Sequence, residues 1–266
     1  MFRTILKEHR DFKNQIFKLS RSELIKTYKG AALGPLWAVI KPAITIFVYW
    51  FAFQIGLRAN RSVEGIPFFL FLMTGMIPWF FMHDAILDGS ACFRKKKAFI
   101  TKMSFPVSTI PTYTLLSNLY IHLLLCVLMY AVLLISGVSP SVYNLQFFFY
   151  MPVMYVCFLF LSWILAPLSA VSRDFQNLVK AIITALFWLS GIIWDPYSLS
   201  SDLLRRVVTA TPITYFANGY RNAFLFEKWF FMTRYETFCC LIWIVGFLIV
   251  GVYTYKRARR VIPDVL

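Results

Sequence analysis

The sequence predicts an all-α integral membrane protein with six transmembrane helices, and three observations support this fold class. The run 103–172 has 70 residues and contains no Asp, Glu, Lys or Arg. At about 1.5 Å per helical residue, it is about three times as long as a roughly 30 Å hydrocarbon core requires, so it must cross more than once. Hydrophobic residues make up 59% of the chain, which is more than one soluble core buries. Lys and Arg residues gather in the segments between the apolar stretches.

The first element is an N-terminal cytoplasmic arm over residues 1–34, which carries eight Lys or Arg residues. It is too long and too charged for a cleavable signal peptide, so we expect it to be retained. Between residues 12 and 28 apolar side chains recur at helical spacing, namely Phe12, Ile16, Leu19, Leu24, Ile25 and Tyr28. This pattern predicts an amphipathic interfacial helix. A basic flank that only fixes the topology is the alternative.

A transmembrane domain follows over residues 35–256, with a cytoplasmic tail at 257–266. Four apolar segments have the length and composition of membrane spans, at residues 36–57, 66–88, 175–194 and 237–255. The charge-free run supplies two more spans, because Ser136, Gly137 and Pro140 form a turn signal in its middle. The prediction is therefore six crossings.

The loop charges predict the orientation of these spans. Eighteen Lys and Arg residues fall on one side of the predicted topology and seven on the other. Because positively charged loops resist translocation, we expect both termini to be cytoplasmic and the protein to be a multi-pass component of the plasma membrane. The net charge of +15 then follows from topology and from attraction to anionic lipids, and nucleic acid is not needed as a partner.

Cysteine usage points to no metal or redox chemistry. The five cysteines fall in or beside predicted spans without ligand spacing, at positions 92, 126, 157, 239 and 240. We interpret them as structural thiols.

The predicted cytoplasmic loop 94–106 combines basic residues with apolar ones. Phe99 and Met103 are four residues apart with Ile100 beside them, so a short helix here would have one apolar face. Such a face could fill a groove on a partner protein. A basic loop that dips into the lipid headgroups is the alternative.

An outer segment precedes the last predicted span. Residues 207–220 are uncharged but too short to cross, and Pro212 and Gly219 interrupt them. We expect a re-entrant or interfacial segment at this position.

Several segments of this chain resemble a known family. They are YKG at 28–30, LGPLW at 33–37, KP at 41–42, GMIPWFF at 75–81, ITKMSFP at 100–106, RD at 173–174, PITY at 212–215 and GYR at 219–221. In order and spacing, over nearly the whole chain, they look like the permease subunits of ABC exporters for cell-surface polysaccharides. SFPVSTIPTY at 104–113 most resembles the wall teichoic acid exporters of Gram-positive bacteria. One departure is Thr211, where many relatives place Asn.

The resemblance implies a complex of two permease copies and two ATPase subunits. This chain has no G-x-x-x-x-G-K-[ST] motif, so we expect ATP and Mg²⁺ to be bound by the separate ATPase and no cofactor by the permease. The implied cargo is a polyprenyl-diphosphate-linked polymer, which is anionic if it is teichoic acid. The implied coupling residues lie in the basic loop, at Phe99, Ile100, Lys102, Met103, Phe105 and Pro106.

The cargo path is predicted from charged and aromatic residues. Lys41 and Lys180 are the Lys residues inside predicted helices, where charges are functional candidates, although snorkelling to the interface is the alternative. Arg221 could receive phosphate at the outer exit. Stacking surfaces for sugars could come from aromatic residues, which otherwise pack in the core or form an interfacial belt, namely Trp79, Phe187, Trp188, Trp194, Tyr215 and Tyr220.

Two other function classes are compatible with these patterns. The His83-x4-Asp88 spacing resembles an acyltransferase signature, which suggests an integral-membrane acyl- or glycosyl-transferase. Five helical steps rotate by about 140°, however, so His83 and Asp88 point apart, whereas Asp84 and Asp88 share a face. We expect this face to form a polar helix end or a cytoplasmic vestibule. An exporter of small lipids or drugs is the second alternative.

Overall fold

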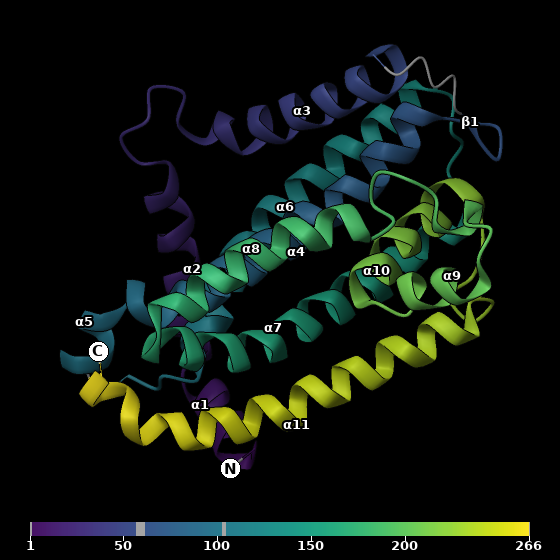
Figure 1. The fold of residues 1–266 in the computed structure, drawn as a ribbon. Coiled ribbons are helices and arrows are strands. Elements are labelled where there is room, and N and C mark those ends of the chain that lie inside the picture. The colour runs from purple at the N-terminus through teal and green to yellow at the C-terminus, as the bar shows by residue number, and fades with distance from the viewer. Residues whose placement is uncertain (1, 57–61, 103–104, 266) are drawn as a thin grey trace.

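The computed structural model describes residues 2–56, 62–102 and 105–265, most of which lie in helices (Figure 1). Met103 of the predicted coupling residues lies outside this range. The membrane-length helices are Trp37–Trp50 (α3), Phe68–Lys95 (α4), Thr109–Ile135 (α6), Phe147–Val171 (α7) and Arg234–Val265 (α11). A one-turn 3-10 helix at Gly34–Leu36 and a π-helix at Phe51–Gly56 extend α3, and a 3-10 helix at Val142–Gln146 precedes α7.

Five segments of the described chain are long and apolar enough to cross a membrane, and each matches a predicted span. They are Gly34–Gly56, Phe68–Lys95, Thr109–Ile135, Val142–Val171 and Arg234–Ala258. The predicted break in the charge-free run is confirmed, because α6 ends at Ile135 and Gly137 takes a positive φ of 85°. Ser141 then caps the next helix by accepting a hydrogen bond from the backbone N–H of Tyr143 at 3.4 Å.

The predicted fifth span is shorter than the others. Helix α8 (Arg173–Leu189) has 17 residues, which corresponds to about 26 Å. It begins where α7 ends, and Arg94 at the end of α4 donates to the backbone carbonyls of Ser169 and Ala170 there. Beyond its other end, the carbonyls of Gly191 and Ile192 accept hydrogen bonds from Arg221. Helix α8 therefore connects the two ends of the molecule, and the count of six spans stays a prediction.

The N-terminal arm forms two helices, α1 (Phe2–Asp11) and α2 (Lys13–Tyr28), where the sequence predicted one. Both helices are hydrogen-bonded to α6. The His9 Nε2 and Thr112 Oγ1 atoms are 2.7 Å apart, and the Ser20 and Tyr120 hydroxyls are 3.2 Å apart. The apolar side of the arm thus packs partly on protein, and its position along the membrane surface stays a prediction. We call the end of the molecule with α1, α2 and α5 (Lys97–Lys102) the basic end.

The opposite end, which we call the hairpin end, holds the short elements. The strands β1 (Ser62–Val63) and β2 (Ile66–Pro67) pair antiparallel around a two-residue turn in which both φ angles are positive, as in a type I′ hairpin. The predicted re-entrant segment 207–220 covers the end of α9 (Asp202–Thr209) and nearly all of α10 (Pro212–Arg221), and α10 is buried throughout. A π-helix follows α10 at Asn222–Phe226, and a 3-10 helix at Pro196–Ser198 precedes α9. Thr211 caps α10 by accepting the Thr214 N–H at 3.3 Å, and Thr is one of the residue types that favour this position.

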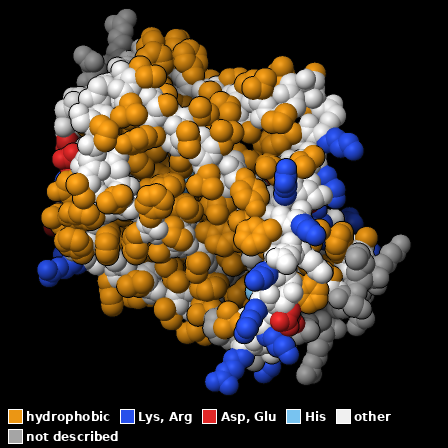
Figure 2. All heavy atoms as spheres, turned by 180° about the vertical axis from the view of Figure 1, so that it is seen from behind, with side chains coloured by type: hydrophobic (Ala, Val, Ile, Leu, Met, Phe, Trp, Pro, Cys, Tyr) orange, Lys and Arg blue, Asp and Glu red, His pale blue; other side chains and the backbone are white. Residues whose placement is uncertain are grey.

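Helix α4 is the centre of the core. In its most apolar stretch 78% of residues are buried, against 11% in the α3 and α11 segments, which therefore lie at the periphery. Helix α4 packs against α6, α7 and α10. Gly75 permits the approach of α10, because a Cβ atom there would overlap the Arg221 guanidinium. Seen from behind, the surface is largely hydrophobic, with Lys and Arg side chains gathered along one edge (Figure 2).

Candidate functional site

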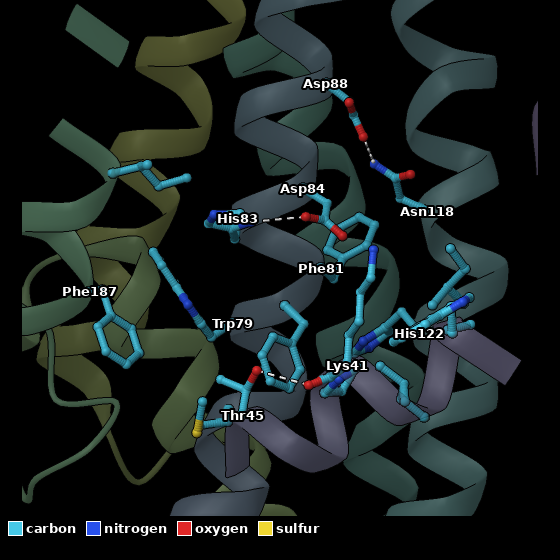
Figure 3. A pocket seen from close by; sticks show the side chains of 18 of the residues that line it. Lys41, Thr45, Trp79, Phe81, His83, Asp84, Asp88, Asn118, His122 and Phe187 are labelled. Carbon is cyan, nitrogen blue, oxygen red and sulfur yellow. Dashed lines mark hydrogen bonds and ion pairs between the residues drawn. The ribbon is translucent and has the colours of Figure 1, made fainter. Parts of the chain in front are cut away.

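A cavity of about 830 Å³ lies between α3, α4, α6 and α8 and reaches the end of α2 (Figure 3). We call it the α3–α4 pocket. Its lining combines aromatic rings with a few polar groups, which is typical of small-molecule and sugar sites. The residues that matter below are Tyr28, Lys41, Tyr49, Trp79, His83, Asp84, Asp88, Asn118, His122, Phe187 and Trp188.

The polar wall of the pocket comes from one side of α4. His83 Nδ1 lies 2.9 Å from Asp84 Oδ1. One turn further along, Asp88 accepts hydrogen bonds from Asn118 Nδ2 of α6 at 3.2 Å and from Lys95 Nζ at 2.7 Å (Figure 3). His83 and Asp88 were predicted to point apart, but both line this cavity, although their hydrogen-bond partners differ. A cytoplasmic vestibule at this face stays a prediction.

The aromatic wall is built from α3, α4 and α8. The Trp79 and Phe187 ring centroids are 5.4 Å apart, and those of Tyr49 and Phe187 are 5.2 Å apart. Trp79 and Phe187 are buried within the protein, whereas Trp188 is half exposed. Such ring faces can stack on the apolar faces of sugars while neighbouring polar groups bind hydroxyls.

Lys41 places a positive charge at the mouth of this pocket. Its ammonium lies 5.7 Å from the Trp37 ring centroid, within reach of a cation–π contact. Its backbone carbonyl accepts a hydrogen bond from the Thr45 hydroxyl at 2.8 Å, one turn further along α3. The pocket therefore holds one ammonium near two carboxylates, those of Asp84 and Asp88.

The predicted path residues lie in three places. Lys41, Trp79, Phe187 and Trp188 meet in the α3–α4 pocket. Lys180 is exposed on α8 and does not line it. The remaining path residues lie toward the hairpin end, namely Trp194, Tyr215, Tyr220 and Arg221.

Arg221 occupies a structural position. Its side chain is 1% exposed, and its guanidinium lies 3.6 Å from the Phe71 ring centroid. It donates to the carbonyls of Phe71, Gly191 and Ile192 and to Asn218 Oδ1. These bonds use most of the N–H donors of the guanidinium, so few are left to bind a phosphate. The surroundings of Arg221 therefore do not support the prediction that it receives a phosphate group. The sequence could not reveal this burial, because an Arg between apolar residues looks the same whether it faces a conduit or a core.

Tyr215 and Tyr220 are also buried. The Tyr220 hydroxyl and His122 Nε2 are 2.7 Å apart, which links α10 to α6 beside the pocket. Tyr215 accepts a hydrogen bond from the Thr237 hydroxyl at 3.3 Å. Trp194 is half-buried, and its indole N–H donates to the Trp188 carbonyl at 3.0 Å. These three side chains shape the hairpin end and do not line the α3–α4 pocket.

The sequence analysis missed several pocket residues. Asn118 and His122 are polar, four residues apart and inside the charge-free run, so they share one face of α6. That spacing was the available signal, because polar side chains in a membrane span usually face the protein interior. Tyr28 was assigned only to the amphipathic arm. Partial burial and the nearby Asp84 carboxylate raise the pKa of its hydroxyl, which stays protonated and able to donate.

Two of the predicted coupling residues, Phe99 and Phe105, belong to an aromatic cluster at the basic end. Phe105 lies between the rings of Phe99, Phe12 and Tyr113, with centroids 6.1, 5.6 and 6.4 Å away. Ile100 is 9% exposed. The predicted apolar face of this loop therefore packs largely on its own chain. Lys102 is the last residue of α5, and Pro106 is half-buried. Contact of these residues with an ATPase stays a prediction.

The N-terminal arm also contacts this region. Lys96, beside α5, forms an ion pair with Glu23 of α2. Ser108, which precedes α6, donates a hydrogen bond to Glu8 of α1. The arm, the α5 loop and the start of α6 thus form one connected unit.

Comparison with known proteins agrees with this architecture. Residues 14–225 match the family of ABC-2 type transporters. The chain is 24% identical over 221 residues to an O-antigen export system permease protein RfbA of Myxococcus xanthus, covering 83% of this chain and 84% of the relative. It is 26% identical over 260 residues to a protein of the same name from Klebsiella pneumoniae, covering 93% of each chain. The family match covers well over half of the sequence, and the chain belongs to the ABC-2 type transporter family.

Proposed function

We propose that this chain is the membrane permease of an ATP-driven exporter for a lipid-linked cell-surface polysaccharide. The main support is the α3–α4 pocket, whose aromatic and polar lining lies between membrane-spanning helices of an ABC-2 protein. The relatives named above are O-antigen export permeases and align with most of this chain. The cargo moves from the cytoplasmic to the outer side of the plasma membrane.

The pocket lining favours a weakly charged glycan. The lining contains one ammonium, from Lys41, and two carboxylates, from Asp84 and Asp88, the second of which is paired with Lys95, so the wall has no excess of positive charge. A polyanion would gain little electrostatic attraction from such a wall. Polyprenyl-diphosphate-linked wall teichoic acid is the finer prediction, and it requires cationic groups beyond those of this pocket.

Energy comes from a separate ATPase subunit that binds ATP and Mg²⁺. We place its docking site at the basic end, on the exposed side of α5 and the adjoining arm. Two permeases and two ATPases form the working complex, and the two permease copies enclose the conduit between them.

Both termini are cytoplasmic in this proposal, and α8 is the sixth crossing. Helix α1 and the end of α11 lie toward the same end of the molecule (Figure 1), which supports an even number of crossings. With the five long spans, α8 would be the sixth. The excess of Lys and Arg at the basic end supports its cytoplasmic location.

The experiment isolates the tagged chain from its native membrane in mild detergent. An ATP-binding protein should co-purify at one per permease, and a polyprenyl-linked glycan should raise the ATPase rate. An uncharged glycan and a teichoic acid on the same lipid are compared, because the stronger stimulant identifies the cargo class. A chain that purifies alone and stimulates no ATPase would contradict the proposal and reopen the transferase alternative.

A further inference from the structure

A second cavity, of about 580 Å³, lies at the hairpin end. It is bounded by the β1–β2 turn, α4, the 195–197 loop, α10 with its π-helix extension, and the start of α11. We call it the hairpin-end pocket. None of its lining residues lines the α3–α4 pocket, so the two cavities are separate sites. The residues used below are Glu64, Asp195, Tyr197, Asn218, Arg221, Lys228, Met232, Arg234 and Glu236.

The charges of the hairpin-end pocket balance. Three carboxylates, from Glu64, Asp195 and Glu236, face three cationic side chains. Two of the cations already have partners, because Arg221 is bonded to backbone carbonyls and Lys228 Nζ lies 3.2 Å from Glu64 Oε2. Within the described residues no group of three or more His, Cys, Asp or Glu is arranged to hold a metal ion. The lining therefore favours an uncharged polar ligand over an anion or a cation.

Two buried side chains offer hydrogen bonds inside this pocket. Asn218 is 4% exposed, and its Oδ1 accepts a bond from Arg221 Nη1 at 3.0 Å. Its Nδ2 lies near the Tyr197 hydroxyl but has no partner with hydrogen-bond geometry among the described residues. Glu236 is 7% exposed, and its Oε1 accepts a bond from the Tyr197 hydroxyl. Because buried polar groups are nearly always satisfied, an unused amide donor that lines a cavity indicates a ligand or water there.

An amide donor beside a carboxylate acceptor suits one ligand class particularly well. Each sugar hydroxyl both donates and accepts a hydrogen bond, so a hydroxyl-rich ring can use Asn218 and Glu236 together. Phe71, Phe226 and Tyr235 add aromatic surface to the same cavity. Sugar sites need this combination of planar polar groups with rings.

We infer that the hairpin-end pocket binds a saccharide unit of the exported glycan, at a site distinct from the α3–α4 pocket. This inference rests on the proposed function, because it takes the cargo's own sugars as the ligand. Under the predicted orientation the pocket faces outward and holds the glycan as it leaves the conduit.

The test uses the purified permease–ATPase complex in lipid nanodiscs and a readout confined to the pocket. Met232 lines the pocket and is 61% exposed, so Met232→Cys provides a site for maleimide labelling. The probes are an N-acetylglucosamine disaccharide, a mannose disaccharide and methyl rhamnoside. At least one of them should slow labelling of Met232→Cys. Leu203→Cys, on α9 and outside the pocket, is the matched control and should be labelled at an unchanged rate.

Two substitutions in the Met232→Cys background test the assigned groups. Asn218→Asp keeps the oxygen that Arg221 uses and removes the unused donor, and Glu236→Gln keeps an acceptor for Tyr197. Each should raise the half-protecting sugar concentration about tenfold or more, as expected for loss of a hydrogen bond to a charged or buried group. Asp202→Asn, on exposed α9, should leave it unchanged. If either variant fails to assemble with the ATPase, Tyr197→Phe is measured in its place. Tyr197 is 45% exposed and its hydroxyl is bonded to Glu236, so this variant removes one hydroxyl of the pocket and should also raise the half-protecting sugar concentration.

Three results would overturn the inference. They are no protection by any of the three sugars, equal protection in the Asn218 and Glu236 variants, and protection by inorganic phosphate or calcium chloride instead of sugar. The export assay separates this failure from that of the proposed function. A complex that exports glycan without sugar protection at Met232→Cys refutes only the inference, whereas a complex that exports no glycan refutes the proposed function.

Discussion

At the scale of single residues, the polar side chains of the α3–α4 pocket differ in whether they have a partner. His83 is bonded to Asp84, Asp88 to Asn118, and His122 to Tyr220. Lys41 has a ring contact with Trp37, and among the described residues no carboxylate forms an ion pair with it. A cation in a membrane-spanning segment without a fixed counter-charge is available to a ligand.

We predict that Lys41→Gln weakens the response of the complex to its cargo. The ammonium can donate to the diphosphate or to the sugars of the glycan, and a hydrogen bond to a charged group is worth about 1.5–3 kcal/mol. The glycan concentration that gives half-maximal ATPase stimulation should therefore rise about tenfold. Lys180→Gln is the matched control, because Lys180 is exposed on α8 outside the pocket. If both substitutions change this glycan concentration equally, the Lys41 ammonium does not bind the cargo and instead extends to the membrane interface.

Residue type alone predicted part of this site. Trp79, Phe187 and Lys41 follow from aromatic and charged residues within apolar spans, and the structure brings them together. Arg221 has the same appearance in the sequence but lies in the core, because its partners are backbone carbonyls that no side-chain pattern reveals. Partners far apart in sequence, such as His122 with Tyr220, depend on tertiary packing in the same way.

At the scale of secondary-structure elements, the α5 loop and the N-terminal arm move as one unit if the aromatic cluster holds them together. Phe105 contacts rings from the arm, from α5 and from α6. A displacement of α5 by an ATPase would then reach the start of α6 through Phe105.

We predict that Phe105→Ala uncouples ATP hydrolysis from export. Loss of the central ring leaves α5 free to move without α6, so glycan exported per ATP should fall about fivefold or more, at the low end of typical couplings between sites. ATPase subunits should still co-purify with the variant. Phe238→Ala on α11 is the matched control, because Phe238 is 63% exposed and no ring contact joins it to the cluster among the described residues. Normal export by Phe105→Ala would remove the cluster from the coupling route.

The helices were predicted more accurately than their surroundings. Long apolar runs and the turn at Gly137 specify spans because a membrane core tolerates little else. Helix α2 matches the helix predicted between residues 12 and 28, whereas α1 was not predicted, because Phe2, Ile5 and Leu6 are its only apolar residues among charged and polar ones. A re-entrant or interfacial segment was predicted over residues 207–220 from its length and lack of charge, but the complete burial of α10 depends on the close approach that Gly219 allows to Tyr150.

At the scale of the whole molecule, the uneven burial of the spans indicates how the chain assembles. Only 11% of the most apolar stretch is buried in each of the α3 and α11 segments. Both faces must meet lipid or another protein, because neither is covered within the chain. The α3–α4 pocket opens beside α3, so a second copy packed along α3 would close two such pockets into one conduit.

We predict that two copies of this permease meet at α3 and not at α11. Phe47 on α3 and Ile249 on α11 are 56% and 64% exposed, so cysteines at these positions are similarly accessible. Under oxidising conditions in the membrane, Phe47→Cys should give a disulfide-linked dimer, because facing copies bring the two thiols close together. A short bifunctional thiol reagent should link the same two cysteines if they are slightly too far apart for a disulfide. Ile249→Cys, which would face lipid, should stay monomeric on the same gel. Equal cross-linking of both variants would indicate random collision. If neither cross-links and each intact complex contains one permease, the conduit would have to form within a single chain, and the α3–α4 pocket alone would have to admit the glycan.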